Sequence, residues 1–483
     1  MTSNDLFERI PQELRLIIVD DLSFEDLLRL RVICKSWYDV FCDTDICAHA
    51  IKKYFPLPLE HYFENSGFDC NELKNDDKKK RDWIRKFMIN RIRREHGIAT
   101  QRSQLNYGVD LDMLDLSYSY GRVAVKEENK IIIQNLITKK KFICTTPTPE
   151  FSYSRTSEKW KLSEQYLVFS HERSGWEILA WNLSSKRLFR TKLSKKILRL
   201  SAYQNQVGVV TLSCHQKTRT YESFIWDIGG ALMKLHEIKV DLDSSEDLLM
   251  STNIFFHNVE KDISFLVNIY QIRSSLGSTK VGTKATVHCF KADEIIQTQH
   301  EILYTSSKPF TFRSFMTTND IFIGIEISEN PQQSLNQNIY KYITYDMNKK
   351  KFDHLEVRLH PTPWRSLFGY KNLIWRDQIY IPVPNKEIQH LQVVTISKSV
   401  SDLWDEPWRT AYSPILSSVP SSISRGETRS NSSSVGIEIP GQNLIINSEV
   451  QIWGDDSFII MKNEIGLQFW RFDDLGLTPS YDI

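Results

Sequence analysis

The chain has 483 residues, of which 41% are hydrophobic and 25% are charged, a composition typical of an ordinary globular protein. Its 61 basic and 60 acidic residues leave a formal charge of +1, so no overall field draws it to nucleic acid or to an anionic membrane. No apolar run approaches the roughly 18 residues that a membrane-spanning helix needs, and we expect neither a membrane nor a nucleic-acid partner.

The compartment follows from the N-terminus and from the cysteines. The first ten residues, MTSNDLFERI, lack the basic and apolar regions of a secretory signal. The 7 cysteines have no paired spacing, which indicates reduced thiols. We therefore expect a cytoplasmic or nuclear protein.

Residues 10–47 read IPQELRLIIVDDLSFEDLLRLRVICKSWYDVFCDTDIC and predict short amphipathic helices. Pro11 suits the first turn of a helix, where its missing N–H would be unpaired in any residue. Apolar residues recur at helical spacing from Leu14 to Leu22, and Ser23 can cap a second helix. Helices this short cannot bury all of their apolar surface among themselves. The segment must therefore pack on the next domain or present a face to a partner.

This segment resembles the F-box in its order of residue types. The matching residues are Pro11, Glu13, Leu14, Leu22, Asp26, Leu27, Leu30, Cys34 and Trp37. The segment departs from the family near its end, where Ile46-Cys47 stands in place of the usual Leu-Trp. The alternative is a helical cap whose apolar stripe is simply part of the core.

The resemblance implies that residues 5–50 form a small helical module that binds a Skp-type adaptor and, through it, a cullin. On this reading the adaptor contacts come from the apolar residues of the module and from its proline. The expected contact residues are Ile10, Pro11, Leu14, Ile18, Leu22, Leu27, Leu30, Cys34 and Trp37.

Residues 51–97 predict a helical linker. Trp83, Ile84, Phe87, Met88 and Ile92 form an apolar stripe with basic residues around it. The basic clusters could be read as a nuclear signal or a nucleic-acid patch. The interleaved acidic residues and the aromatic stripe favour a solvated helix that packs on the next domain. The segment also resembles the Asp-Trp helix that links the F-box to the propeller in related proteins.

Residues 98–483 change to short β-branched and aromatic runs that repeat along the chain. In each repeat an apolar or aromatic strand ends in Asp or Asn and is followed by a polar turn and another apolar run. The clearest segments are KIIIQNLITKKKF from Lys130, WEILAWNLSSKRLF from Trp176 and ESFIWDIGGALMKL from Glu222. Asp or Asn suits such a turn because its side chain can bond backbone groups two residues on.

The spacing of the repeats predicts the architecture. Asn135, Asn182 and Asp227 stand 47 and 45 residues apart, the length of one four-stranded propeller blade. Weaker repeats start at Thr286, Lys341, Leu391 and Gly466, which gives about seven blades. A closed ring also removes exposed sheet edges. We expect a strand within 98–109 to complete the last unit beside residues 467–472. The alternative is a pair of β-sandwiches.

One stretch of this domain lacks strand character. Residues 413–434 are rich in serine, contain Pro414, Pro420 and Gly426, and predict a mobile loop without packing contacts. Whether the loop is regulatory or only a spacer stays open at this point.

The sequence contains no established catalytic motif. It has no phosphate-binding glycine loop, no nucleophile-elbow motif, no H-E-x-x-H and no C-x-x-C. Cys42, Cys47 and His49 could in principle begin a zinc site, but no fourth ligand is near and buried thiols are the simpler reading. We expect no catalytic residues, no metal and no cofactor.

Tryptophan beside arginine is the remaining signal, because both are typical anchors at protein interfaces. The three pairs that we expect to contact a target protein are Trp364-Arg365, Trp375-Arg376 and Trp408-Arg409. The alternative for most tryptophans is packing between blades.

The predicted fold class is α+β multidomain, with a helical F-box, a helical linker and an all-β propeller. By resemblance, such a chain is the substrate-recognition subunit of a Skp–cullin–F-box ubiquitin ligase: the helices hold the adaptor and the propeller holds an unknown protein substrate. It would raise the effective concentration of substrate without performing chemistry. The alternatives are an F-box protein that serves with its adaptor as an assembly platform outside a ligase, and a propeller hydrolase.

Overall fold

The structure is a computed structural model of the chain. It describes parts of residues 10–49, residues 85, 88–90, 93–94 and 99–105, and, from residue 116 onward, the strands of the β domain with most of their hairpins. Residue contacts divide the chain into two compact units. One unit comprises Met1–Asn106 and Gly369–Ser480, and the other comprises Tyr107–Phe368 and Tyr481–Ile483.

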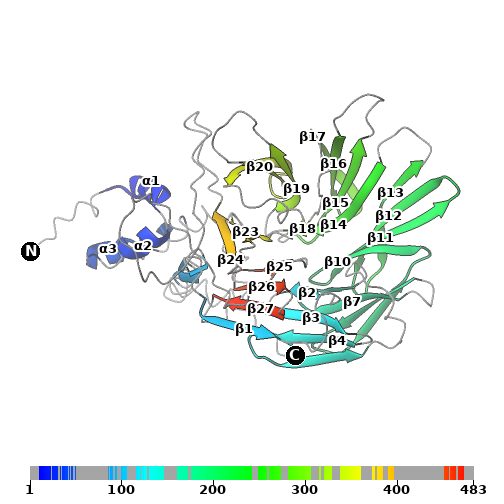
Figure 1. The fold of residues 1–483 in the computed structure, drawn as a ribbon, viewed down its shortest axis with the longest axis horizontal. Coiled ribbons are helices and arrows are strands. Elements are labelled where there is room, and N and C mark those ends of the chain that lie inside the picture. The colour runs from blue at the N-terminus through cyan, green and yellow to red at the C-terminus, as the bar shows by residue number, and fades with distance from the viewer. Residues whose placement is uncertain are drawn as a thin grey trace, which may run out of the picture. The chain divides into compact units, whose positions relative to one another are not determined.

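Three short helices open the first unit: α1 (Gln12–Asp21), α2 (Phe24–Leu30) and α3 (Lys35–Phe41) (Figure 1). The backbone N–H groups of Leu14 and Arg15 both donate to the carbonyl of Pro11 at 3.1 Å, so α1 begins at the proline as the sequence predicts. Ser23, the expected cap of the second helix, lies outside the described residues. None of the described helices is long and apolar enough to cross a membrane.

The predicted linker helix is described at only a few positions. Residues 85, 88–90 and 93–94 are helical, and the side chains of Met88 and Arg94 are buried. The guanidinium of Arg94 lies 5.9 Å from the ring centroid of Phe472, in the same unit. The linker helix therefore contacts the end of the last strand. The other four residues of the predicted stripe lie outside the described residues.

Antiparallel sheets of four strands make up most of the β domain. In the second unit the sheets are β2–β5 (Leu116–Ser119, Arg122–Glu127, Lys130–Asn135, Lys141–Thr145), β6–β9 (Trp160–Leu162, Tyr166–His171, Glu177–Asn182, Leu188–Lys192), β10–β13 (Lys196–Tyr203, Gln206–His215, Thr218–Asp227, Leu232–Asp241), β14–β17 (Leu248–Phe256, Ile263–Ile272, Val281–Lys291, Glu294–Thr305) and β18–β21 (Phe315–Met316, Asp320–Ser328, Asn338–Asp346, Lys351–Leu359). In the first unit they are β22–β24 (Leu373–Trp375, Gln378–Val383, His390–Thr395) and β1 (Gln101–Leu105) with β25–β27 (Gln451–Gly454, Phe458–Asn463, Gly466–Arg471).

Helices near the N-terminus followed by an all-β propeller confirm the predicted fold class. Six sheets have the four strands of a complete blade, against the expected count of about seven, and β22–β24 is a further sheet of three described strands. The repeat segments identified in the sequence fall on β4, β8, β12, β16, β20, β24 and β27. Small sheets in succession along the chain are not the two large sheets of a sandwich.

One blade joins strands from both ends of the β domain. β1 pairs antiparallel with β27, from Gln101 opposite Arg471 to Leu105 opposite Leu467. Next to this pair, the backbone N–H and the hydroxyl of Thr100 donate to the carbonyl of Arg471, at 2.7 and 3.0 Å. The pairing predicted between 98–109 and 467–472 is confirmed (Figure 1).

The Asp or Asn at the end of the third strand makes the predicted turn contacts in three blades. The side-chain oxygen of Asn135 accepts the backbone N–H groups of residues 137 and 138, at 2.8 and 3.0 Å. Asn182 and Asp346 each accept the corresponding two N–H groups of their own turns. Four residues after each lies a lysine with positive φ: Lys139, Lys186 and Lys350.

Asp227, at the corresponding position of β12, makes different contacts. Its carbonyl accepts the N–H of Gly230 at 2.7 Å, and its carboxylate accepts Gln206 Nε2 at 2.9 Å. Gly229 takes the positive φ, at 91°, which a glycine adopts without steric cost. The carboxylate of this aspartate therefore bonds the neighbouring strand, and only its backbone carbonyl bonds within the turn.

Successive sheets of the second unit pack on one another through apolar side chains. Trp160 on β6 is buried in a cluster with Ile131 and Ile133 on β4, and Trp226 is buried in a cluster of the next sheets. Polar contacts add to this packing: the N–H of Leu162 donates to the hydroxyl of Ser117 at 3.1 Å. Trp160 and Trp226 therefore pack between blades, which was the alternative interpretation for most tryptophans.

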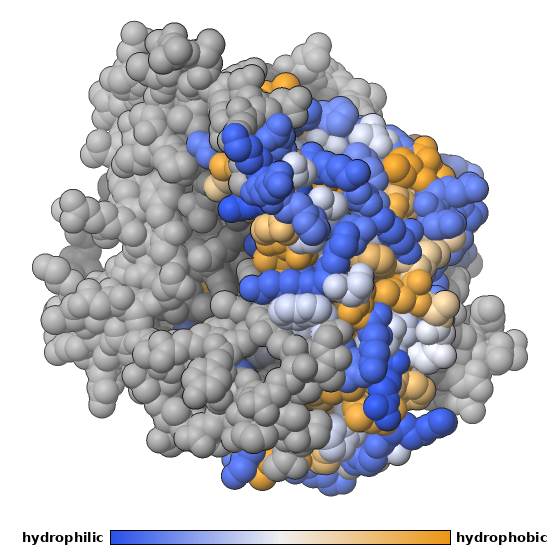
Figure 2. All heavy atoms as spheres, turned by 90° about the vertical axis from the view of Figure 1, so that its right-hand side faces the viewer, coloured by the Kyte–Doolittle hydropathy of each residue, from blue (hydrophilic) through white to orange (hydrophobic). Residues whose placement is uncertain are grey.

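Hydrophobic side chains also remain at the surface of the second unit. Figure 2 shows several separate hydrophobic patches among hydrophilic residues on the side seen there. The exposed large apolar residues of the outer strand β17 are Ile295, Ile296 and Ile302. Isolated apolar residues of this kind are normal at protein surfaces.

Candidate functional site

The helical module exposes large apolar side chains. Leu14 and Ile17 of α1 are 50% and 59% exposed, Ile33 between α2 and α3 is 60% exposed, and Tyr38 of α3 is 51% exposed. Leu14 and Ile17 are three residues apart on one helix and so lie on the same face. We call these four residues the exposed apolar set. Leu14 and Ile17, adjacent on one helix face at such exposure, make this face of α1 the candidate interaction surface.

The interior of the module explains why α1 turns apolar residues outward. The buried residues of the module include Val19, Leu27, Val40, Phe41 and Ile46. On α1, Val19 is the one apolar residue that is fully buried, while residues 16 and 18 are half-buried. The helix has apolar residues on more of its circumference than the small core can cover. The excess faces solvent in the isolated chain.

The predicted adaptor contacts divide into three classes by burial. Pro11 and Leu14 are exposed. Ile10, Ile18, Leu22, Leu30 and Trp37 are half-buried. Leu27 is only 3% exposed, so its side chain belongs to the interior of the module and supports the surface from within. Cys34 lies outside the described residues. Their contact with an adaptor stays a prediction.

The sequence reasoning missed Ile17, Ile33 and Tyr38 of the exposed apolar set. A signal for Ile17 was present, because it follows Leu14 by three residues on the same helix face. Ile33 lies in the turn between α2 and α3, where helical periodicity gives no information about exposure, and α3, which carries Tyr38, is only seven residues long.

Polar contacts hold the ends of the helices. Arg15 Nε donates to the carbonyl of Ile10 at 2.8 Å. The carboxylate of Asp43 accepts the N–H groups of residues 45 and 46, at 2.9 and 3.2 Å. His49 Nε2 lies 2.7 Å from a carboxylate oxygen of Asp20, in the last turn of α1. These contacts fix the positions of the helices that carry the exposed apolar set.

The described residues contain no group of His, Cys, Asp and Glu that could hold a metal ion. The imidazole of His49 already has the Asp20 carboxylate as a partner. Cys42 and Cys47, the other two residues of the possible zinc site, lie outside the described residues.

Several titratable groups in the propeller have perturbed pKa values, and burial or a neighbouring charge explains each shift. Burial raises the pKa of the Cys144 thiol to about 12, so this thiol stays protonated and is a poor nucleophile. Burial also tends to raise the pKa of Glu222, but hydrogen bonds from Lys195 and Lys234 outweigh it and leave that pKa lowered. Both lysine Nζ atoms lie 2.6 Å from the carboxylate. Glu222 and the two lysines form a structural cluster of two ion pairs.

The tryptophan–arginine pairs are barely represented among the described residues. Trp375 lies on β22, and its side chain is not described. Arg376 and the pairs Trp364-Arg365 and Trp408-Arg409 lie outside the described residues, as does the serine-rich segment 413–434. Their role in target binding stays a prediction.

Comparisons with known proteins identify the helical module. The F-box domain model matches residues 7–49. No curated protein matches the chain.

Among solved structures, the WD40 domain of SCAP from fission yeast is 11% identical with a TM-score of 0.29, over 57% of this chain and 82% of that one. TolB from Acinetobacter baumannii is 9% identical with a TM-score of 0.28, over 66% and 68% of the two chains. The AfRom2 CNH domain is 9% identical with a TM-score of 0.29, over 76% and 97%. Likenesses this weak carry no argument about function.

Proposed function

We propose that the chain, an F-box protein with a C-terminal β-propeller domain, is the substrate-recognition subunit of a Skp–cullin–F-box ubiquitin ligase. F-box domains bind Skp-type adaptors, so the proposed first partner is such an adaptor and the second is the cullin bound to it. The propeller would hold the protein to be ubiquitinated. We further propose that the working parts are residues 5–50, 51–97 and 98–483, acting in the cytoplasm or nucleus.

The observation that carries the proposal is the exposure of Leu14 and Ile17 on α1, inside the F-box match. Large apolar side chains at the centre of an interface supply most of its binding energy when a partner removes them from water. Leu27, Val40 and Phe41 are buried in the same module and form part of its core. Leu14 and Ile17 are therefore in contact with water until a partner covers them.

In this role the chain performs no bond chemistry. It would join two binding sites in one molecule, so that a target held by the propeller meets the ubiquitin-charged enzyme at a high effective concentration.

The test is adaptor binding by the Leu14→Ala/Ile17→Ala double variant, measured by calorimetry with a purified Skp-type adaptor. Each truncation removes roughly 1–3 kcal/mol on the scale of interface hot spots, so we expect affinity to fall at least about tenfold. The matched control is Ile295→Ala/Ile302→Ala, which truncates two exposed isoleucines on β17 and should bind as the wild type does. Wild-type affinity of the folded double variant would overturn the proposed adaptor surface.

The second candidate function is an assembly platform that uses the adaptor outside a ligase. The exposed apolar set serves this function equally well. Purification of the full chain from cells separates the two functions: cullin retained together with the adaptor supports the ligase, and adaptor without cullin supports the platform.

A further inference from the structure

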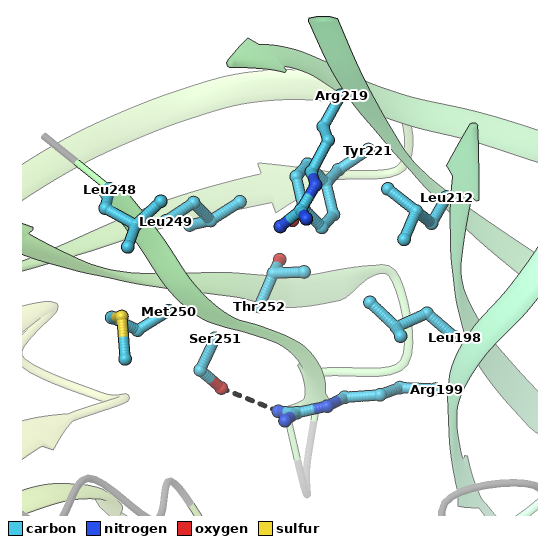
Figure 3. Close-up of a pocket in the computed structure, with 10 residues that line it drawn as sticks. All are labelled: Leu198, Arg199, Leu212, Arg219, Tyr221, Leu248, Leu249, Met250, Ser251 and Thr252. Atoms are coloured by element: carbon cyan, nitrogen blue, oxygen red, sulfur yellow. Dashed lines mark hydrogen bonds between the residues drawn. The ribbon is translucent and has the colours of Figure 1, made fainter. Parts of the chain in front are cut away.

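A pocket of about 360 Å³ opens between the sheets β10–β13 and β14–β17 of the second unit (Figure 3). Its apolar walls come from Leu198, Leu212 and Tyr221 on one sheet and from Leu249 and Met250 on the other. Met250 is exposed, while Leu249 and Tyr221 are buried. The pocket is therefore open at one side and has a preformed apolar interior. A volume of this size is at the lower end of ligand sites in proteins.

The guanidinium of Arg219 and the hydroxyl of Thr252 also line the pocket. Figure 3 shows the guanidinium of Arg219 directed toward the hydroxyl of Thr252, in front of the ring of Tyr221. Arg219 is an exposed residue of β12, and the described part of the chain places no ion-pair partner on it. An exposed guanidinium above an apolar pocket attracts a ligand that carries an anion beside an apolar group.

The floor of the pocket is held in place by hydrogen bonds between the strands. One terminal nitrogen of Arg199 donates to the hydroxyl of Ser251 at 2.6 Å and to the side-chain oxygen of Asn253 at 2.9 Å. The hydroxyl of Thr252 donates to the side-chain oxygen of Asn268 at 2.6 Å. These contacts connect β10 to β14 and β14 to β15. The pocket therefore does not depend on a ligand for its shape.

We infer that this pocket binds a linear segment of the target protein, with one large aliphatic or aromatic side chain in the pocket and an Asp or Glu carboxylate on Arg219. The volume suits one such side chain, and the arginine selects for an acidic neighbour. An extended peptide can present both groups two residues apart, on one side of its backbone. The inference rests on the proposed function, in which the propeller holds the target.

The experiment is selection from a phage-displayed library of random 12-residue peptides against the full chain bound to its adaptor. We expect enrichment of peptides with an acidic residue within two positions of Leu, Ile, Met or Phe. A selected peptide is then titrated against variants by fluorescence anisotropy. Arg219→Glu should weaken binding by about tenfold or more, because it replaces an attraction with a repulsion. Leu212→Trp, which fills the pocket from β11, should abolish binding.

The matched control is Arg190→Glu, which makes the same charge change at an exposed position of β9. It should leave peptide affinity unchanged, and all three variants should retain the adaptor. Enrichment without the acidic and apolar pair, or a selected peptide that binds Arg219→Glu and Leu212→Trp as tightly as the wild type, would overturn the inference. Failure of the proposed function is a separate result, because it appears as loss of adaptor or cullin while the peptide still binds.

Discussion

Gly208 on β11 lies against Ile254 on β14, the first strand of the next sheet, with no room for a side chain between them. A Cβ atom added at Gly208 would lie 2.8 Å from the Cβ of Ile254, and it would also meet the hydroxyl of Ser201. Real Cβ atoms do not approach carbon this closely, so the two sheets can pack at this point only because residue 208 is glycine.

Gly208→Ala should therefore destabilise the propeller. The added methyl group must displace Ile254 or move the sheets apart, which costs about 1–3 kcal/mol for overpacking of a core. Urea unfolding followed by tryptophan fluorescence measures the change. Ile254→Gly should cost less in the Gly208→Ala background than in the wild type, because it removes both the Cβ and the Cγ2 that the new methyl group would meet. Additive costs would show that the contact is not the cause.

The Asn182 turn offers a test of the repeat that the sequence revealed. Its side chain accepts the N–H groups of Ser184 and Ser185, at 3.1 and 2.8 Å. Asn182→Ala leaves both amides to water and should lower the free energy of unfolding by about 1 kcal/mol. Asn182→Asp keeps the acceptor and should cost less. Ser184→Ala, which changes an exposed side chain in the same turn, is the control and should have little effect.

Leu27 and Leu14 should respond to truncation in opposite ways. Leu27 is buried within the helical module, so Leu27→Ala should destabilise the module by about 2–4 kcal/mol through a cavity. Leu14 is half exposed, so Leu14→Ala should leave the melting temperature nearly unchanged and weaken adaptor binding. Circular dichroism and calorimetry on the same samples separate the two effects. A stable Leu27→Ala variant with weak adaptor binding would instead place Leu27 in the interface.

These contacts show which parts of the fold could be predicted from the sequence. The turn contacts of Asn135 and Asn182 were predictable because Asx side chains readily bond backbone amides two residues on. The positive φ of Lys139, Lys186 and Lys350 was not, since lysine has no preference for that conformation and the blade imposes it.

The candidate site shows the same division. The order of residue types around Pro11 and Leu14 indicated the helical module and its partner. The exposure of Ile33 and Tyr38 depends on how three short helices pack, and the pocket beside Arg219 forms only where two consecutive sheets pack on one another. Packing of this kind leaves no local pattern to read.

The histidines between β13, β16 and β17 should make stability depend on pH. The ring centroids of His236 and His288 lie 5.0 Å apart, and Thr298 is hydrogen-bonded to His288 at 2.9 Å. Burial, and then the nearby His236 and His300, lower the pKa of His288 from 6.5 to about 4. Between pH 6.5 and about pH 4, His288 binds a proton in the unfolded chain but not in the folded chain. The free energy of unfolding therefore falls as the pH drops through this range.

The size of this effect is about 1 kcal/mol at pH 5, after allowance for the solvent that reaches the partly exposed ring. Urea midpoints at pH 7.5 and pH 5 measure it. His288→Gln should reduce the loss between the two pH values, because glutamine does not titrate. His215→Gln, at an exposed position of a hairpin, is the control and should leave the loss unchanged. Equal pH dependence of wild type and His288→Gln would contradict the assignment.

The pairing of β1 with β27 predicts that the two ends of the β domain stabilise one another. Five residues of β1, from Gln101 to Leu105, pair with β27, although the strands are separated by most of the chain. Replacing Gln101–Leu105 by Gly-Pro-Gly-Pro-Gly removes backbone donors and makes the strand unable to pair. We expect the amides of β27 to lose hydrogen-exchange protection, while those of β11 and β15 in the other unit keep theirs.

The same replacement at Leu188–Lys192 of β9, also the outer strand of a four-stranded sheet, is the matched control. It should remove protection from its neighbour β8 and leave β27 unchanged. Because β9 follows its own sheet directly along the chain, its loss disturbs only local contacts. Loss of β1 removes a long-range contact and should also lower the melting temperature by several degrees. Full protection of β27 without β1 would show that β25–β27 is stable as a three-stranded sheet and that the strand from residues 101–105 is dispensable.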